Sequence, residues 1–171
     1  LDILTLAPMI LDVAPECVHA KARTRSRGGS QYANAGRSSF SQGVRNGAAT
    51  EAGIERRLPL IQEGGLTFAV NFDDHLDTGI FLDHRVTRDL VRRHARGCRR
   101  FLNLFAYTGT ATCYAADGGA EETVTVDLSN TYLAWAERNM RQNGFAGSRH
   151  EFIRADVRRW IAEQRLTRNR W

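Results

Sequence analysis

Residues 100–109 read Arg-Phe-Leu-Asn-Leu-Phe-Ala-Tyr-Thr-Gly, and this stretch decides the fold of the chain. Its apolar run predicts a buried β-strand, and Thr108 with Gly109 predicts a turn into a helix. Residues 123–127, Thr-Val-Thr-Val-Asp, form a second run that ends in a carboxylate, 18 residues after Gly109. Residues 151–156, Glu-Phe-Ile-Arg-Ala-Asp, form a third short run that ends in an acid. Strands that alternate with helices in this order predict a parallel sheet covered by helices.

The same patterns set the expected bounds of the elements around this stretch. Strands are expected at 101–105, 123–127 and 151–154, with helices at 86–96, 109–117, 130–142 and 157–164. Upstream, 58–62 and 66–72 are expected to pair as a β-hairpin around the turn Glu63-Gly64-Gly65.

Two of the helices have a predicted apolar face. For the helix over 86–96, ended by Gly97, the face is Val86, Leu90, Val91 and Ala95. For the helix over 130–142, capped by Ser129 or Asn130, the face is Tyr132, Leu133, Trp135, Ala136 and Met140.

The glycine and the two acids predict a site for an adenosine-containing cofactor at the ends of the strands. Gly109 allows close backbone approach, and the free N–H groups of the following helix favour a carboxylate or phosphate. A single glycine in place of GxGxxG favours S-adenosylmethionine, which presents a carboxylate there, over NAD. Asp127 is expected to bind the ribose hydroxyls and Asp156 the adenine amino group. Each acid is equally placed to cap the helix that follows it, and an NAD-dependent dehydrogenase stays the rival class of enzyme.

These elements predict an α/β, Rossmann-like class I methyltransferase fold, of which the chain holds the first half of a doubly wound parallel sheet. Residues 1–72 are expected to form a small basic β-rich appendage, with a flexible loop at about 33–53. Residues 73–171 are expected to be the N-terminal half of the methyltransferase domain. Because the sequence ends after three strands, we expect a fragment whose sheet is completed by the missing C-terminal half.

The composition is that of an ordinary globular protein, with 171 residues, 42% apolar and 25% charged. No apolar run reaches the roughly 18 residues that span a membrane, and the opening segment lacks the basic start of a signal peptide. Cys17, Cys98 and Cys113 form no CxxC pair, so no metal site is predicted and the cytoplasm is the expected location. We expect Cys98 and Cys113 to be buried structural thiols.

A basic segment in the N-terminal part predicts a polyanionic partner. Four cations, Lys21, Arg23, Arg25 and Arg27, alternate with other residues, and the chain carries a net charge of +5. On a strand these side chains would share one face and suit the phosphates of a nucleic acid. The alternative is a solvated edge strand protected by its charges.

Long segments of the chain resemble the C-terminal half of the bifunctional bacterial 23S rRNA guanine methyltransferases. They are residues 71–85, 101–109 and 126–139, with further similarity at 21–25 and 28–32. The resemblance implies that Asp83 and Arg85 close over the cofactor. Together with these two, the expected cofactor residues are Phe105, Tyr107, Thr108, Gly109, Asp127, Ser129 and Asp156, and the expected RNA-binding residues are Lys21, Arg23, Arg25 and Arg27. The catalytic residues stay unknown, because the Asp-Pro-Pro motif that the resemblance implies would lie beyond the last residue.

The resemblance also implies a reaction. The C-terminal half of these enzymes methylates guanine N7, so the expected substrate is 23S rRNA or its assembly intermediate. Guanine N7 carries a free lone pair and needs no deprotonation, so catalysis would consist mostly of alignment. The alternatives are an rRNA cytosine-C5 or guanine-N2 methyltransferase, or a non-catalytic RNA-binding module.

Overall fold

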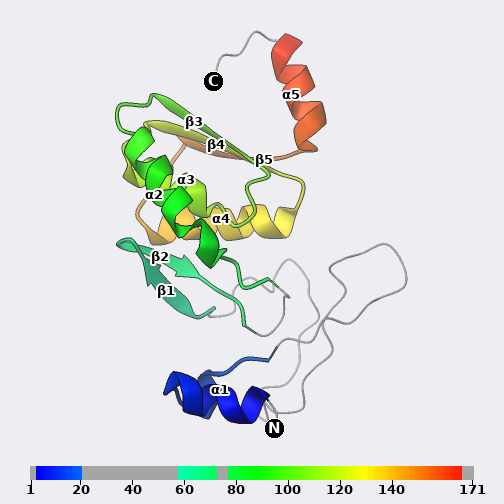
Figure 1. Cartoon of the computed structure of the whole chain (residues 1–171). Coiled ribbons are helices and arrows are strands. Elements are labelled where there is room, and N and C mark those ends of the chain that lie inside the picture. The colour runs from blue at the N-terminus through cyan, green and yellow to red at the C-terminus, as the bar shows by residue number, and fades with distance from the viewer. Residues whose placement is uncertain (1–2, 21–57, 73–76, 167–171) are drawn as a thin grey trace, which may run out of the picture. The chain divides into compact units, whose positions relative to one another are not determined.

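The structure is a computed structural model that describes residues 3–20, 58–72 and 77–166 (Figure 1). The described residues belong to two compact units, one with residues 3–20, 71–72 and 77–78 and the other with residues 58–70 and 79–166. Among the described residues, every strand belongs to the larger unit. No described helix has both the length and the apolar character needed to cross a membrane.

The larger unit is built on a parallel three-stranded sheet, in the order β3-β4-β5. The strands are β3 (Arg100–Leu104), β4 (Glu122–Asp127) and β5 (His150–Arg154). In register, Leu104 pairs with Val126 and Asp127 pairs with Arg154. Because the strands are parallel, their carboxyl ends meet at one edge of the sheet. The parallel sheet predicted from the sequence is confirmed.

Helices cover both faces of this sheet (Figure 1). They are α2 (Arg85–His94), α3 (Thr110–Asp117), α4 (Asn130–Gln142) and α5 (Val157–Leu166). Val157 and Trp160 of α5 pack on Val124 and Val126 of β4. Figure 1 shows α5 on the opposite side of the sheet from α3 and α4, as a doubly wound sheet requires after its third strand.

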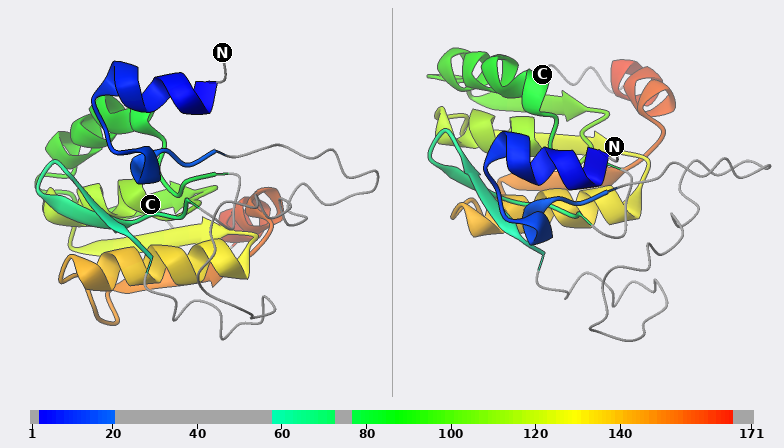
Figure 2. Two further views of the ribbon diagram at one scale, coloured as in Figure 1. Left: turned by 90° about the horizontal axis from the view of Figure 1, so that it is seen from below. Right: turned by 60° about the horizontal axis from the view of Figure 1, so that its bottom comes forward.

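The predicted β-hairpin forms at the expected place in the sequence, but its strands are shorter than predicted. β1 (Leu60–Glu63) pairs antiparallel with β2 (Leu66–Ala69), and Gly64 and Gly65 supply the positive φ angles of the turn, 58° and 82°. Figure 2 shows the hairpin against the helical layer of α3 and α4. Side chains of α4 hold β2, since Trp135 Nε1 donates to the carbonyl of Ala69 at 3.0 Å.

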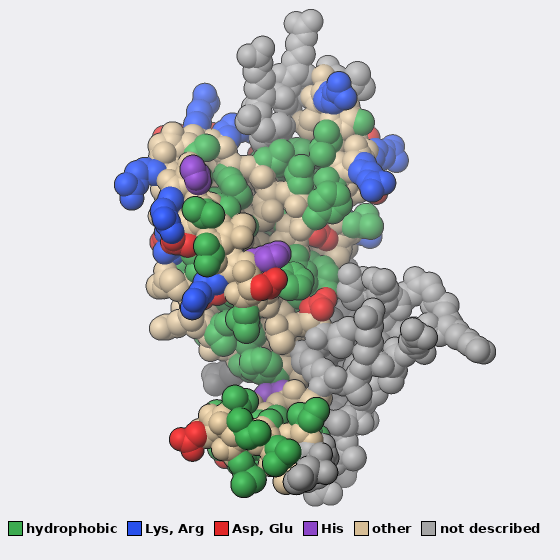
Figure 3. Space-filling model, in the orientation of Figure 1, with side chains coloured by type: hydrophobic (Ala, Val, Ile, Leu, Met, Phe, Trp, Pro, Cys, Tyr) green, Lys and Arg blue, Asp and Glu red, His purple; other side chains and the backbone are tan. Residues whose placement is uncertain are grey.

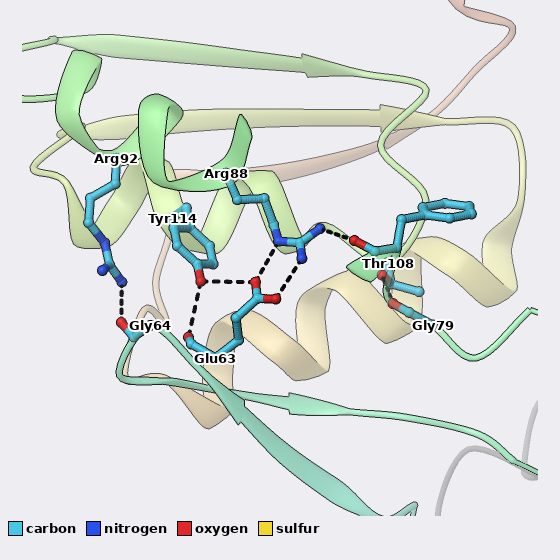
Figure 4. A network of polar contacts seen from close by, with 8 residues as sticks. Glu63, Gly64, Gly79, Arg88, Arg92, Thr108 and Tyr114 are labelled. Carbon is cyan, nitrogen blue, oxygen red and sulfur yellow. Dashed lines mark hydrogen bonds and ion pairs between the residues drawn. The ribbon is translucent and has the colours of Figure 1, made fainter. Parts of the chain in front are cut away.

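The predicted apolar face of α2 is wrong for its first two residues only; Val91 and Ala95 pack in a buried cluster, as predicted. Val86 and Leu90 are exposed, by 64% and 43%, whereas Arg88 is buried at 3%. Arg88 is buried because Glu63, at the end of β1, pairs with its guanidinium (Figure 4). A charged residue can face the interior when an opposite charge and hydrogen bonds meet it there. Apolar spacing alone did not reveal this partner, which lies 25 residues earlier in the chain.

The smaller unit contains helix α1 (Ile3–Leu11) and a 3-10 turn, η1 (Pro15–Cys17). The ring of His19 stacks on Phe72, with centroids 4.7 Å apart. The predicted basic residues Lys21, Arg23, Arg25 and Arg27 lie outside the described residues. The predicted loop at 33–53 also lies outside them, and the domain boundary at residue 72 stays a prediction.

Candidate functional site

The loop between β3 and α3 turns sharply at the carboxyl edge of the sheet. Phe105, Tyr107 and Gly109 all have left-handed φ angles, of 55°, 53° and 68°. The strand therefore ends at Leu104, and Phe105 is 69% exposed, where the sequence predicted a buried strand residue. Non-glycine residues in this conformation are uncommon and concentrate at functional sites.

Asp127, the last residue of β4, is held by backbone groups on both sides. Its Oδ2 accepts a hydrogen bond from the N–H of Tyr107, and its Oδ1 accepts one from the N–H of Ser129, both at 2.9 Å. The residue is half-buried. Each carboxylate oxygen can accept more than one hydrogen bond, so this oriented carboxylate keeps capacity for hydroxyl donors of a ligand.

Ser129 is the N-cap of α4, which confirms it over Asn130, the other predicted cap. Its hydroxyl oxygen accepts from the N–H of Tyr132 at 3.3 Å. The cap places the first turn of α4 directly after Asp127. A further role for Ser129 toward the cofactor stays a prediction.

The turn at Thr108 and Gly109 lies directly on α4. The Thr108 carbonyl accepts from Asn139 Nδ2 at 2.9 Å, and the Thr108 hydroxyl donates to the carbonyl of Gly79 at 2.6 Å. A Cβ on Gly109 would come within 2.6 Å of the Ala136 Cβ. Glycine is therefore required here both by its φ angle and by the closeness of the helix.

The Tyr107 side chain is tied to the segment that precedes α2. Its hydroxyl accepts from the N–H of Gly79 at 3.0 Å. Its ring lies edge-on to Tyr132, with centroids 4.6 Å apart, and 5.2 Å from Phe81. Tyr132 also joins Trp135 and Ala69 in a buried cluster, which confirms the reading of these two aromatic residues as core.

Asp156 is exposed and caps α5. Its Oδ1 accepts from the N–H of Arg159 at 3.0 Å. The capping alternative for this acid is therefore confirmed, and its role toward adenine stays a prediction.

Asp83, His84 and Arg85 lie on the surface at the start of α2. Asp83 and His84 side chains are 80% and 61% exposed, with Oδ2 and Nε2 3.8 Å apart. Arg85 is exposed and begins the helix. The closure of Asp83 and Arg85 over a cofactor stays a prediction.

The two thiols of the larger unit differ in burial. Cys113 is fully buried in α3, and this burial raises the pKa of its thiol from 9.0 to about 12. Cys98 is half-buried and its Sγ donates to the carbonyl of Arg100 at 3.2 Å. The predicted buried thiol is confirmed for Cys113, and Cys98 is less buried than predicted.

Sequence reasoning missed Asn139 and Gly79, which hold the loop from two sides. Asn139 is fully buried beside the apolar residues of α4. A signal was present, since an amide at a position that shares a face with Trp135, Ala136 and Met140 must find buried partners. Gly79 had no comparable signal, because it lies in an irregular segment before α2.

Comparison with known proteins assigns the family. Residues 15–168 match a family model described as S-adenosylmethionine-dependent methyltransferase. The chain belongs to this family. The Rossmann-like class I fold and S-adenosylmethionine as the cofactor, both predicted from the sequence, are thereby confirmed.

Relatives and solved structures of this methyltransferase family agree with the match. The chain is 46% identical over 167 residues to the ribosomal RNA large subunit methyltransferase K/L of Methylococcus capsulatus, covering 98% of this chain and 20% of that protein. It is 48% identical over 160 residues to the protein of the same name from Allochromatium vinosum, covering 94% of this chain and 19% of that protein. The chain thus spans about a fifth of the length of these relatives.

Among solved structures, the methyltransferase SMU.776 complexed with SAH aligns with a TM-score of 0.60 and 35% identity. The alignment covers 63% of this chain and 28% of that chain. A SAM-dependent methyltransferase from Agrobacterium tumefaciens aligns with a TM-score of 0.59 and 26% identity, covering 63% and 35% of the two chains.

The edge of the sheet in this methyltransferase fits the cofactor chemically. Asp127 offers a carboxylate to hydroxyl groups, and Gly109 lets the turn lie directly against Ala136 of α4. Phe105, which follows β3, and Leu128, which follows Asp127 at the end of β4, expose apolar surface, by 69% and 63%. The space-filling view shows hydrophobic side chains gathered on the face of the larger unit that it presents (Figure 3). An oriented acid beside exposed apolar groups suits a ligand with both a sugar and a flat ring.

Proposed function

We propose that the carboxyl edge of the sheet binds S-adenosylmethionine, and that the chain is part of an enzyme that methylates guanine N7 of 23S rRNA in the cytoplasm. The observation that carries the cofactor assignment is the carboxylate of Asp127. It stands at the end of the central strand, oriented by two backbone N–H donors at 2.9 Å. An acid in this position binds the ribose hydroxyls of a nucleoside cofactor.

The roles of the chain's own residues follow from this placement. Asp127 accepts hydrogen bonds from the ribose, while the turn at Thr108 and Gly109 presents the start of α3 to the carboxylate end of the cofactor. Phe105 and Leu128 provide apolar contacts next to the acid. Asp156 accepts a hydrogen bond from the adenine amino group, in addition to capping α5. Asp83 and Arg85 close over the site from the start of α2.

S-adenosylmethionine, when bound, supplies an electrophilic methyl group. Guanine N7 attacks through a lone pair, so no residue of the chain has to remove a proton first. The contribution of these residues is to hold donor and acceptor in line and to exclude water. The target base must leave its stack to enter the pocket, at a cost of about a few kcal/mol.

The rRNA substrate is supported by the K/L relatives and by the charge of the chain. The proposed contacts to phosphate are Lys21, Arg23, Arg25 and Arg27. Replacing all four with alanine should weaken rRNA binding and flatten its salt dependence, because fewer counterions are released. Cofactor affinity should stay unchanged, and an equal loss of both would contradict this separation of roles.

A cytosine-C5 reaction finds no support in the thiols of the larger unit. That chemistry needs a nucleophilic cysteine, and a nucleophilic thiol has a lowered pKa. Cys113 is buried with its pKa raised to about 12, and Cys98 precedes the amino end of β3, away from the carboxyl edge. Guanine N2 remains the nearest alternative acceptor.

Two experiments test the proposal. The first is calorimetric titration of S-adenosylhomocysteine into the chain and into its Asp127→Ala variant, with circular dichroism to verify folding. Binding that the variant loses supports the site, and no binding by the folded wild-type chain overturns the assignment of the site to these residues.

The second experiment identifies the acceptor atom. Unmodified 23S rRNA is incubated with the intact protein and S-adenosylmethionine, and its nucleosides are separated by liquid chromatography against authentic standards and identified by mass spectrometry. 7-Methylguanosine is expected. N2-methylguanosine alone, or 5-methylcytidine, would reject the N7 assignment while leaving the cofactor site in place.

A further inference from the structure

Helix α4 and its C-cap present three polar side chains to the hairpin at a spacing of four residues: Trp135 and Asn139 in the helix, and Asn143 at the cap. This spacing places them on one face of the helix. Asn143 bonds both backbone groups of Thr67, accepting from its N–H and donating to its carbonyl, each at 2.8 Å. Trp135 Nε1 donates to the carbonyl of Ala69 at 3.0 Å. These two residues fasten β2 to the helix.

Asn139, in the middle of this row, bonds in two directions. Its Oδ1 accepts from the N–H of Ala69 in β2 at 3.0 Å. Its Nδ2 donates to the carbonyl of Thr108 in the loop at the edge of the sheet, at 2.9 Å. The side chain is 0% exposed. One buried amide therefore joins the hairpin to the loop proposed to bind the cofactor.

Thr108 is fixed from its other side as well. Its hydroxyl donates to the carbonyl of Gly79, which lies beside it (Figure 4). Thr108 is 0% exposed. Gly109 follows with its Cα against Ala136 of α4. With the carbonyl of Thr108 held by Asn139, the peptide plane between Thr108 and Gly109 has a single orientation.

The groups on either side of this plane belong to the proposed cofactor site. The N–H of Tyr107, one residue earlier, donates to Asp127, and α3 begins one residue after Gly109. We infer that Asn139 is a positioning residue for the cofactor loop, acting through the carbonyl of Thr108. The inference rests on the proposed function of this loop and adds a residue that does not itself touch the cofactor.

Asn139→Asp removes one of the two contacts selectively. The carboxylate keeps an acceptor for the N–H of Ala69 but has no donor for the carbonyl of Thr108. Asn143→Asp is the control, since it makes the same change at the C-cap of α4. It keeps an acceptor for the N–H of Thr67 and loses the donors to the carbonyls of Thr67 and Asn139, but it makes no contact with Thr108. Both variants should unfold at lower urea concentration. Only Asn139→Asp should weaken binding of S-adenosylhomocysteine, by about tenfold, because it alone releases the loop.

Two resonances of the folded chain separate positioning from simple loss of stability. The indole N–H of Trp135 reports whether β2 stays on α4, and the amide N–H of Tyr107 reports its bond to Asp127. In Asn139→Asp the Tyr107 amide should shift while the Trp135 indole keeps its position. In Asn143→Asp the Tyr107 amide should stay in place.

The outcomes distinguish the positioning role of Asn139 from the proposed cofactor site itself. If the wild-type chain does not bind S-adenosylhomocysteine, both are overturned. If it binds, and Asn139→Asp binds equally well with an unmoved Tyr107 amide, only the inference is overturned. Should Asn139→Asp not fold, Asn139→Ser replaces it, because serine removes the amide contacts without adding a charge. The same weakening is then expected, and wild-type affinity would overturn the inference.

Discussion

Glu63 and Arg88 form a bidentate ion pair inside the larger unit (Figure 4). Arg88 Nε donates to Glu63 Oε1 and Nη2 donates to Oε2, both at 2.8 Å, with side-chain exposures of 4% and 9%. The third guanidinium nitrogen, Nη1, donates to the carbonyl of Phe81. The pair therefore fixes the hairpin and the segment before α2 at the same time. The loop between β3 and α3 contacts both the hairpin and this segment, so the pair supports its position.

Replacement of Arg88 by methionine should lower the free energy of unfolding by about 3–5 kcal/mol, because the carboxylate of Glu63 stays buried without its cation. Urea denaturation followed by circular dichroism measures the change. The matched control is Arg93→Met on the same helix, where Arg93 pairs with Asp89 on the surface. That pair should contribute less than about 1 kcal/mol. Equal losses in the two variants would contradict the assigned importance of burial.

A double variant tests whether the unpaired carboxylate of Glu63 causes this loss of stability. Glu63→Gln combined with Arg88→Met removes both charges, so no buried ion is left unpaired. The double variant should therefore be more stable than Arg88→Met alone. Additive losses would show that the two side chains act independently.

Gly109→Ala should be destabilising for two reasons, the left-handed backbone and the close contact with α4. Gly97 shares only the first of these properties, so Gly97→Ala separates their effects. Gly109 has φ of 68° and no room for a Cβ, whereas Gly97 has φ of 75° with nothing within 4 Å of the added carbon. Gly97→Ala should cost only the left-handed conformation, about 1–2 kcal/mol. Gly109→Ala should cost more and should also weaken binding of S-adenosylhomocysteine, as measured by calorimetry. Equal costs would show that the approach of Ala136 is unimportant.

Asp156 has a cap role that can be separated from a ligand role. Serine is a good N-cap but is too short to reach a cofactor, so Asp156→Ser should keep the stability of α5. Asp156→Ala should lose about 1 kcal/mol with the cap. If Asp156 binds adenine, both variants should lose affinity for S-adenosylhomocysteine to the same extent. Wild-type affinity in Asp156→Ser would restrict this acid to capping.

The strands, the helix over 130–142 and the position of Asp127 at the end of a strand were predictable, because each depends on a local sequence pattern. The β-branched run before Asp127 and the cap at Ser129 are examples. What the sequence did not reveal depends on partners far along the chain. Arg88 is buried through Glu63, and Asn139 through Thr108 and Ala69, at separations of 25, 31 and 70 residues. Periodicity assigns a face to apolar residues, but it carries no information about which distant group satisfies a buried charge or amide.

The left-handed residues of the loop were missed for a related reason. Phe105 continues the apolar run of β3 in the sequence, yet its φ of 55° ends the strand and exposes its ring. Tertiary contacts impose this conformation, and one of them is the hydrogen bond from the N–H of Tyr107 to Asp127. The sequence pattern therefore does not distinguish an apolar residue that continues a strand from one that turns outward at its end.

Cys113 should be inert in the folded chain and should make stability fall at alkaline pH. Burial raises its thiol pKa from 9.0 to about 12, so the folded state holds this proton more tightly than the unfolded state. The stabilisation is complete below pH 9 and is lost as the pH rises from 9 toward 12. The pH dependence of the urea midpoint between pH 8 and pH 10.5 should therefore be steeper in the wild type than in Cys113→Ala.

Alkylation with iodoacetamide, mapped by mass spectrometry, checks the same property directly. At pH 8.5 the exposed Cys17 should react first, and Cys113 should stay unmodified because neither its proton nor the reagent can pass the surrounding core. In 6 M urea all three thiols should react at similar rates. Modification of Cys113 at the rate of Cys17 in the folded chain would show that α3 opens readily, and the Gly109 turn at its start would then open with it.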